Sequence, residues 1–500
     1  MEGSKIIEYR KEKIIKWIKN PYNLAFLGVL IFAIIIRIYY FFLTYNQALW
    51  WDEAEYMSMA KAWAFGWDYT FLTVRPILFS FISSLFLRIS VSEFLPRIFI
   101  LLISMSTIIG IYLLGKEIFD RKIGIVSALF MSVFYLNLFF TYRLLVDLVS
   151  LAFYTFSAFF FYRYFIKKSV ISLYVGTVLI GIGTMFRIPT VALLFAIVIY
   201  ALITERLKLF KLKEVWVSVI LFFLTISPYI IWGYIKFGKF VILEAGKWNA
   251  PKENILSGGI STLMNYIFLF PVYLSWIGLI IFVLGLFAMY KLFIGFDLLF
   301  KEDNTEIKKY LYLILILIFP ILLISFSLHV NEDRYILNSF PAIFIISGYF
   351  ILTLYHFLKG KIGKIIVILI IIFLLGYLSY FQIHSGDSLI KNKLSSYYPV
   401  KEAGLWLKQN SKFSDKILSK SWPQIEYYSE RKTLMIPSDK EELKSLVSSD
   451  KNFKFYVVSI FEGHDNWMYS FPQEENLTIA QIYFTDLTKK QPSLIVYNLR

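Results

Sequence analysis

The chain has 500 residues, of which 58% are hydrophobic and 19% aromatic, and it contains no cysteine. This composition is typical of an integral membrane protein and excludes disulfides and thiolate metal sites. The formal net charge is +16, but the lysines and arginines stand mainly in short blocks between apolar runs, which favours a role in membrane orientation over nucleic-acid binding.

Eleven apolar runs are predicted to be transmembrane helices. They cover about residues 23–44, 94–115, 123–141, 147–166, 170–186, 190–204, 215–235, 267–293, 310–328, 336–357 and 365–383. Basic residues between Lys5 and Lys19 precede the first run, so residues 1–22 are predicted to be cytoplasmic, without a cleaved signal peptide. Each even-numbered run then ends in a basic loop. This parity predicts a multi-pass protein of the plasma membrane with its acid-bearing loops on the extracytoplasmic side.

The first outer loop, residues 46–92, begins with a dense acidic cluster: Asp52, Glu53 and Glu55 follow the first apolar run directly. Carboxylates at the edge of a bilayer are costly, which makes the cluster a candidate functional site. Helical spacing predicts two interfacial helices in this loop, one from Asp52 to Trp63 and one from Pro76 to Leu87. Glu55 is expected to point away from Asp52, because three helical positions turn it by roughly 300°.

One arginine, Arg37, lies inside the first apolar run, two helical turns from its outer end. A long side chain at that depth can reach the interface, so snorkelling is favoured over a substrate contact.

The composition changes near Ser385, after the last apolar run. Helical patterns occur at residues 400–409 and 439–447, and strand-like runs at 416–419, 433–436, 453–461, 479–484 and 494–499. The sequence therefore predicts a transmembrane domain over residues 23–384 and a small extracytoplasmic α/β domain over residues 385–500.

Several short motifs occur in a fixed order along the chain. An outer Asp52-Glu53 pair is followed by Tyr56, a basic-Pro element, Arg75-Pro76, lies in the same loop, and Asp333-Arg334-Tyr335 follows a late span. With the topology and the closing domain, this set resembles the GT-C class of polyprenyl-phosphate-sugar-dependent glycosyltransferases. The branch most similar in pattern contains the protein O-mannosyltransferases and the lipid A aminoarabinose transferases.

The resemblance implies a GT-C fold and an enzyme that moves a sugar from a polyprenyl monophosphate, dolichyl or undecaprenyl, to an acceptor hydroxyl or phosphate, with inversion. Such a reaction needs a carboxylate base and fixed cations for the phosphate. Asp52 matches the family position of the base, and Glu53 is its alternate or a positioning partner. Asp147 matches a second acid of the family, although an i,i+4 ion pair with Arg143 is equally compatible with the spacing. The implied substrate-binding residues are Tyr56, Arg75, Arg143, Lys247, His329, Arg334 and Tyr335.

No obligatory cofactor is expected. The Asp52/Glu53 cluster is compatible with a divalent cation, since hard cations take carboxylates, but no residue is assigned as a metal ligand. The Trp-Trp-Asp-Tyr-Gly motif of the related oligosaccharyltransferases is missing after residue 385, which favours a monophosphate donor. The expected partners are a polyprenyl-phosphate sugar, the membrane, and an acceptor that is a protein, a lipid or a glycan.

Two other interpretations of the sequence stay open. A lipid-linked sugar flippase or another transporter would use Arg37 and Arg187 as pathway residues, but the sequence shows no internal repeat of the kind common in transporters. A non-enzymatic envelope-assembly protein would use the closing domain for binding and leaves the Asp52 cluster unexplained.

Overall fold

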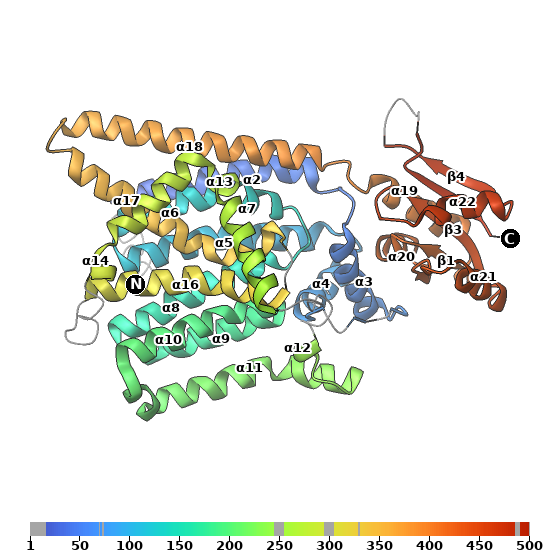
Figure 1. The fold of residues 1–500 in the computed structure, drawn as a ribbon, viewed down its shortest axis with the longest axis horizontal. Coiled ribbons are helices and arrows are strands. Elements are labelled where there is room, and N and C mark those ends of the chain that lie inside the picture. The colour runs from blue at the N-terminus through green and yellow to red at the C-terminus, as the bar shows by residue number, and fades with distance from the viewer. Residues whose placement is uncertain are drawn as a thin grey trace, which may run out of the picture.

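The computed structural model describes residues 17–69, 71–72, 75–244, 255–294, 305–328, 331–485 and 491–499. Figure 1 shows a long helical bundle, two short helices at one of its ends, and a small sheet domain beyond them that carries the C-terminus. The predicted architecture, a polytopic helical protein with a closing α/β domain, is confirmed.

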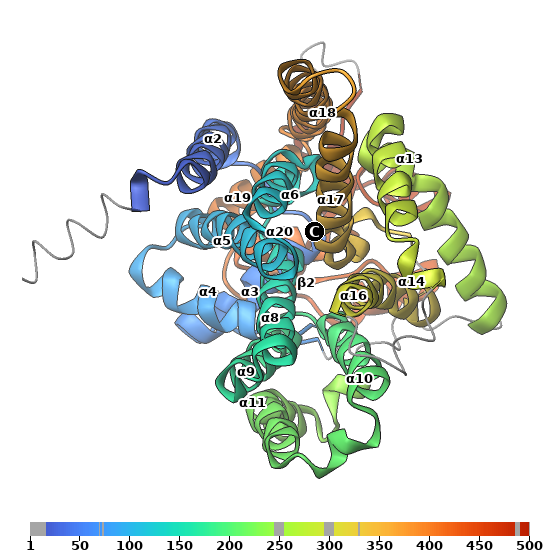
Figure 2. The same cartoon turned by 90° about the vertical axis from the view of Figure 1, so that its left-hand side faces the viewer.

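Within the described residues, nine helices are long and apolar enough to cross a membrane. They are α2 (Pro21–Thr44), α5 (Phe94–Ile118), α8 (Asp147–Lys167), α10 (Ala192–Glu205, flanked by the 3-10 turns η1, Ile188–Val191, and η2, Arg206–Lys211), α11 (Lys213–Phe237), α13 (Ile255–Ala288), α16 (Thr305–Leu328), α17 (Phe340–Leu358, preceded by the 3-10 turn η3, Asp333–Ser339) and α18 (Lys364–Asn392). The end-on view in Figure 2 shows α2, α11 and α13 at the periphery of the bundle, and α18 is also at its edge.

The other two predicted spans are helical but shorter. One is α9 (Val170–Phe186), and the other is divided into α6 (Arg121–Val133) and α7 (Tyr135–Phe140). The division lies at Phe134, whose ψ of 118° is not helical. Gln382 of α18 accepts a hydrogen bond from the Tyr135 backbone N–H at 3.0 Å. A side chain therefore satisfies a backbone group at the break, as a buried amide requires.

Three expectations about the bundle need correction. The eighth span starts at Ile255 instead of residue 267, so its first turns lie in the predicted outer loop, and a kink at Ser275, where φ is 65°, divides it into two helical parts. The helix α18 continues to Asn392 instead of ending near residue 383. Arg37 does not snorkel: it is fully buried and donates to Ser104 and to the Asn137 side chain, at 3.0 and 2.5 Å. Polar groups of neighbouring helices accept the hydrogen bonds of this guanidinium, and no local pattern in the sequence indicates these partners.

The first outer loop contains α3 (Trp51–Phe65) and α4 (Leu78–Ile89). The Glu53 side chain accepts the Trp50 N–H at the start of α3, and Gly66, with φ of 74°, ends the helix in the left-handed conformation that glycine favours. Whereas α4 exposes Phe81, Leu85 and Ile89 on one face, α3 is enclosed almost all round. An apolar face left open is what an interfacial helix needs, so α4 fits that prediction directly.

The closing domain has one five-stranded sheet in the order β2-β1-β3-β5-β4. Its elements are α19 (Tyr398–Asn410), β1 (Lys416–Ser419), α20 (Trp422–Ser429), β2 (Thr433–Leu434), α21 (Lys440–Ser449), β3 (Phe453–Ser459), α22 (Asn466–Glu474), β4 (Thr478–Tyr483) and β5 (Leu494–Asn498). Strands β2, β1 and β3 are parallel, while β5 is antiparallel to both β3 and β4. Alternate residues of the central strands face two separate apolar cores, one including α19 and the other α21 and α22. All five strand-like runs predicted from the sequence are strands.

The closing domain is docked on the first outer loop through α20. Tyr428 accepts the Leu49 N–H at 2.9 Å, and Lys61 of α3 donates to the Tyr427 carbonyl at 2.9 Å. The indole rings of Trp51 and Trp422 meet edge to face, with centroids 6.0 Å apart. In Figure 1, α3 accordingly lies between the bundle and the sheet domain.

Candidate active site

A cavity of about 550 Å³ lies where the bundle, the first outer loop and the segment after α18 meet. Its volume is within the range of small-molecule sites. It is lined by Trp50, Trp51, Asp52, Leu136, Phe139, Phe140, Leu145, Asn331, Glu332, Asp333, Arg334, Leu389, Lys393, Ser396 and Tyr397. The start of α3 and the start of η3 therefore bring together Asp52 and Arg334, which belong to opposite halves of the sequence.

Two guanidinium groups hold the carboxylate of Asp52. Arg75 Nη2 lies 2.5 Å from Oδ1, and Arg334 Nη2 lies 2.8 Å from Oδ2. Burial alone would raise the pKa of Asp52, but the charges and hydrogen bonds of Arg75 and Arg334 outweigh it and lower the pKa below its ordinary value. Asp52 is therefore an ionised carboxylate between two cations, as the sequence-based assignment requires.

Glu55 is closer to Asp52 than expected. Positions i and i+3 share a helix face, because three steps almost complete one helical turn and bring the later side chain back beside the earlier one. The Glu55 carboxylate accepts from Arg75 Nε at 2.5 Å and from the Trp51 indole at 2.8 Å. Glu55 thus pairs with the same guanidinium as Asp52 and fixes the orientation of the Arg75 side chain.

Glu53 faces a different set of partners. Its side chain is fully buried, accepts the backbone N–H groups of Trp50 and Leu144 at 2.6 Å each, and pairs with Arg143 at 3.3 Å. The guanidinium of Arg143 also stacks on the Trp50 ring, 3.7 Å from its centroid. Glu53 therefore connects the start of α3 with the turn before α8. Its contacts are those of a residue that positions these two segments.

The alternative that the spacing left open, an i,i+4 ion pair between Arg143 and Asp147, is wrong. Arg143 lies in the turn before α8 and pairs with Glu53, while Asp147 begins α8 and pairs with Arg187 at 2.6 Å. The i,i+4 geometry requires both residues on one continuous helix, and here the helix starts at the second of them.

Replacing Glu53 by glutamine is expected to destabilise the fold by about 3–5 kcal/mol, because it leaves the buried Arg143 without its counter-charge. Thermal unfolding of the purified protein in detergent measures the loss. The double variant Glu53→Gln/Arg143→Met removes both charges and should recover part of the stability. An unchanged melting temperature in the single variant would contradict the structural role.

Two residues of the network were not singled out as site residues by the sequence. Arg187, at the end of α9, pairs with Asp147, and Glu332, just before η3, pairs with Arg334 at 2.5 Å. Arg334 Nη1 also lies 3.9 Å from Asp147 Oδ2. Arg334, which lines the cavity, therefore contacts Asp147 as well as Glu332. Their positions could have indicated them, because both are charged residues at the ends of predicted spans, on the same predicted side of the membrane as Asp52.

The two candidate tyrosines support arginines. Tyr56 is buried, and the Arg75 guanidinium lies 5.6 Å from its ring centroid. Tyr335 lies below two cations, with Arg187 4.7 Å and Arg334 5.4 Å from its ring centroid. Neither tyrosine is among the described residues that line the cavity. Both are therefore placed to orient these guanidinium groups by cation–π contact without lining the cavity themselves.

Lys247 and His329 lie outside the described residues. The carboxylate oxygens of Asp52 and Glu53 all face donors from arginines or backbone amides. Within the described ranges no group of three acidic, histidine or cysteine side chains is arranged to hold a metal ion. This arrangement does not fit a divalent cation at the Asp52/Glu53 pair.

A family model described as dolichyl-phosphate-mannose-protein mannosyltransferase matches residues 74–232. The matched segment contains Arg75, Arg143, Asp147 and Arg187. No curated protein sequence matches the chain.

Solved structures of similar fold cover nearly the whole chain. ArnT from Cupriavidus metallidurans bound to undecaprenyl phosphate has a TM-score of 0.63 at 11% identity and covers 96% of this chain and 98% of its own. The oligosaccharyltransferase AglB from Archaeoglobus fulgidus, in complex with an inhibitory peptide and a dolichol-phosphate, has a TM-score of 0.59 at 11% identity, with 89% of this chain and 70% of its own covered. The resemblance stated from the sequence motifs is thereby confirmed: the chain has the GT-C fold of these membrane transferases.

Proposed function

We propose that the chain is a membrane glycosyltransferase that moves a sugar from a polyprenyl monophosphate to an acceptor. The observation that carries the proposal is the Asp52 carboxylate held between Arg75 and Arg334 at the edge of a cavity. A base and two phosphate-binding cations are the groups that this transfer requires. The family match and the shared fold with transferases that bind undecaprenyl phosphate or dolichol-phosphate support the donor class.

The reaction we infer is a single displacement. The acceptor hydroxyl gives its proton to Asp52 and attacks the anomeric carbon, and the bond from that carbon to the phosphate oxygen breaks. The electron pair leaves with the polyprenyl phosphate, whose charge Arg75 and Arg334 stabilise. Attack opposite to the leaving phosphate inverts the anomeric centre.

In the structure described here, the arginines that would bind phosphate are occupied by Asp52 itself. A donor phosphate that takes these guanidiniums competes with the carboxylate and loosens its two ion pairs. Asp52 then becomes a stronger base when the donor is bound, which couples proton abstraction to donor occupancy.

The site, α4 and the closing domain lie at one end of the bundle (Figure 1). With the cytoplasmic N-terminus that the positive-inside rule favours, this end is extracytoplasmic. We therefore place transfer on the outer face of the plasma membrane.

Purified protein in lipid vesicles tests the proposal against the flippase alternative. A transferase given dolichyl-phosphate mannose or undecaprenyl-phosphate aminoarabinose, with an envelope extract as acceptor source, releases the bare polyprenyl phosphate and labels the acceptor. Movement of labelled lipid between leaflets, with neither release nor labelling, would instead support the flippase.

The pH profile provides a further prediction. Asp52 acts as a base only when ionised, so activity is present above its pKa and is lost as the pH falls through it. Because Arg75 and Arg334 lower this pKa, the acid limb of kcat/KM should lie below the ordinary range of a carboxyl group. Arg75→Gln should move the limb to higher pH. The matched control is Arg88→Gln, since Arg88 is an exposed arginine of the same loop that contacts the Trp63 carbonyl, and its limb should not move. An unshifted limb in Arg75→Gln would remove Asp52 as the titrating base.

A further inference from the structure

Two charged side chains of the cavity stand outside the ion-pair network. Asp333 and Lys393 line the same cavity as Asp52, and neither forms an ion pair with any residue that the structure describes. Arg334, the neighbour of Asp333 in sequence, is engaged by Asp52, Asp147 and Glu332. The cavity thus has a carboxylate and an ammonium group beside its reactive centre that no described residue neutralises.

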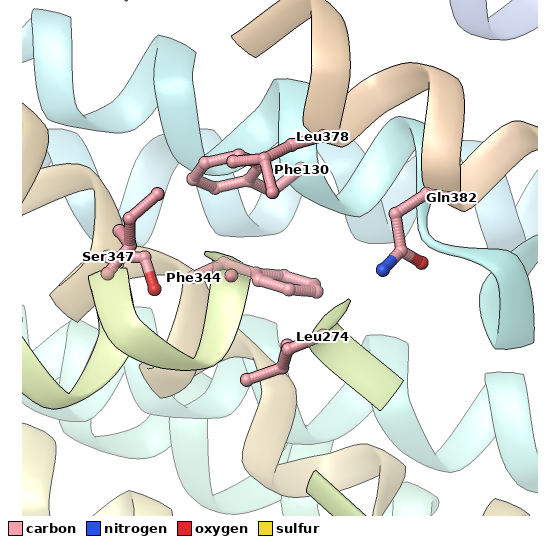
Figure 3. Close-up of a pocket in the computed structure, with 8 residues that line it drawn as sticks. Phe130, Leu274, Phe344, Ser347, Leu378 and Gln382 are labelled. Atoms are coloured by element: carbon pink, nitrogen blue, oxygen red, sulfur yellow. The ribbon is translucent and has the colours of Figure 1, made fainter. Parts of the chain in front are cut away.

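The orientation of Asp333 is fixed by the bundle. Its Oδ1 accepts a hydrogen bond from the hydroxyl of Tyr273, a fully buried residue of α13, at 2.8 Å. The Tyr273 carbonyl in turn accepts from Gln382 Nε2 of α18 at 2.9 Å. Figure 3 shows Gln382 at the edge of a second, apolar cavity within the bundle. The hydrogen bond from Tyr273 therefore fixes Oδ1 of Asp333, while Oδ2 accepts no hydrogen bond from the described part of the chain.

Lys393 comes from a different element, directly after the end of α18. Ser396 and Tyr397 of the following turn line the cavity with it, as do Trp50 and Trp51, which directly precede Asp52 in the sequence. An ammonium group donates up to three hydrogen bonds and accepts none, whereas a carboxylate only accepts. Together they suit a ligand that both donates and accepts.

Phosphate is not such a ligand. It carries only negative charge, so Asp333 would repel it, and Arg75 and Arg334 already provide the planar donors that phosphate prefers. Sugar hydroxyls donate and accept at once, and aromatic side chains offer an apolar surface for the face of a sugar ring. The cavity therefore offers two kinds of charged group, the guanidinium of Arg334 paired with Asp52, and the side chains of Asp333 and Lys393, which form no ion pair among the described residues.

We propose that Asp333 and Lys393 recognise the hydroxyl groups of the donor's sugar and so determine which sugar is accepted. Asp333 accepts from one hydroxyl, and Lys393 donates to another. This inference rests on the proposed function, because it places the sugar of the same polyprenyl-phosphate donor. It assigns Tyr273 as a positioning residue that acts through Asp333.

The test compares three lipids that share dolichyl phosphate and differ only in the sugar: none, mannose or glucose. Binding of dolichyl phosphate and of dolichyl-phosphate mannose to the full-length protein in nanodiscs is measured, with dolichyl-phosphate glucose as the epimeric probe. Asp333→Asn and Lys393→Met should each weaken binding of the better sugar-bearing lipid by about ten- to a hundredfold, as expected for a lost charge-assisted hydrogen bond. Binding of bare dolichyl phosphate should be unchanged, which also shows that the variants fold.

The last turns of α18 offer matched controls, Asp387 for Asp333 and Lys391 for Lys393. Asp387 accepts the Tyr40 hydroxyl at 3.0 Å, as Asp333 accepts that of Tyr273, and Lys391 is a nearby exposed lysine, but neither lines the cavity. Asp387→Asn and Lys391→Met should bind all three lipids like the wild type.

Equal weakening for the bare and the sugar-bearing lipids in Asp333→Asn or Lys393→Met would assign these residues to the phosphate and overturn the inference, as would unchanged binding of the sugar-bearing lipid. A wild-type protein that binds neither dolichyl phosphate nor undecaprenyl phosphate, with or without a sugar, would overturn the proposed donor class itself. The two failures are therefore distinguishable.

Discussion

Asp52→Asn should lower kcat for sugar transfer by about 10²–10⁴-fold, the range expected when a positioned general base is removed. The asparagine is nearly isosteric, so the fold should be retained. The substitution also removes the anion that occupies Arg75 and Arg334. Donor affinity should therefore stay equal or increase while turnover collapses.

This opposite movement of kcat and donor Kd separates a base from a structural carboxylate. The two are measured by single-turnover transfer and by binding of the bare polyprenyl phosphate. Asp387→Asn is the matched control, since this carboxylate lies at the same end of the bundle without lining the cavity. Wild-type turnover in Asp52→Asn would remove the base assignment.

Arg334→Gln should weaken binding of dolichyl phosphate by at least about a hundredfold. Arg334 is the only described residue that reaches Asp52, Asp147 and Glu332 at once, and loss of two charge-assisted hydrogen bonds to a phosphate has this magnitude. Its removal also leaves three carboxylates with less positive charge nearby, so an incoming anion meets a repulsive field.

Arg88→Gln in the first outer loop provides the comparison for Arg334, because it removes one arginine on the same face without touching the network. Increasing salt should weaken donor binding to the wild type more steeply than to Arg334→Gln. A donor Kd that is unchanged in Arg334→Gln would contradict the phosphate assignment.

The fold could be predicted far into its details because its main determinants are local. The hydropathy of one continuous segment marks a membrane helix without any knowledge of its neighbours. All eleven predicted segments are helical, and within the described residues nine helices are long and apolar enough to cross a membrane. The strands of the closing domain were likewise predictable from local sequence, because apolar and polar residues alternate in them and β-branched residues are frequent. The helix boundaries that were misplaced, at Ile255 and at Asn392, are those where a helix continues past the hydrophobic layer into polar sequence.

The site was predictable only in part, because ion-pair partners are determined by packing between distant segments. The order of Asp52, Arg75 and Arg334 along the chain was sufficient to nominate them. No local pattern indicates that Arg143 belongs to Glu53, or that Arg187 at the end of one span belongs to Asp147 at the start of another. Arg37 was misjudged for the same reason, since its partners Ser104 and Asn137 lie on two other elements.

The helix α18 spans 29 residues, about 44 Å at roughly 1.5 Å per residue, which exceeds the roughly 30 Å hydrocarbon layer of a bilayer. It carries Leu378 and Gln382 at the apolar cavity, Leu389 at the charged one, and it leads into the closing domain. One helix therefore connects the apolar interior of the bundle with the candidate site and with the closing domain. Because bilayer thickness influences helix tilt, the geometry of the site depends on the surrounding lipid as well as on the chain. The distances within the site are therefore expected to differ between detergent micelles and native membranes.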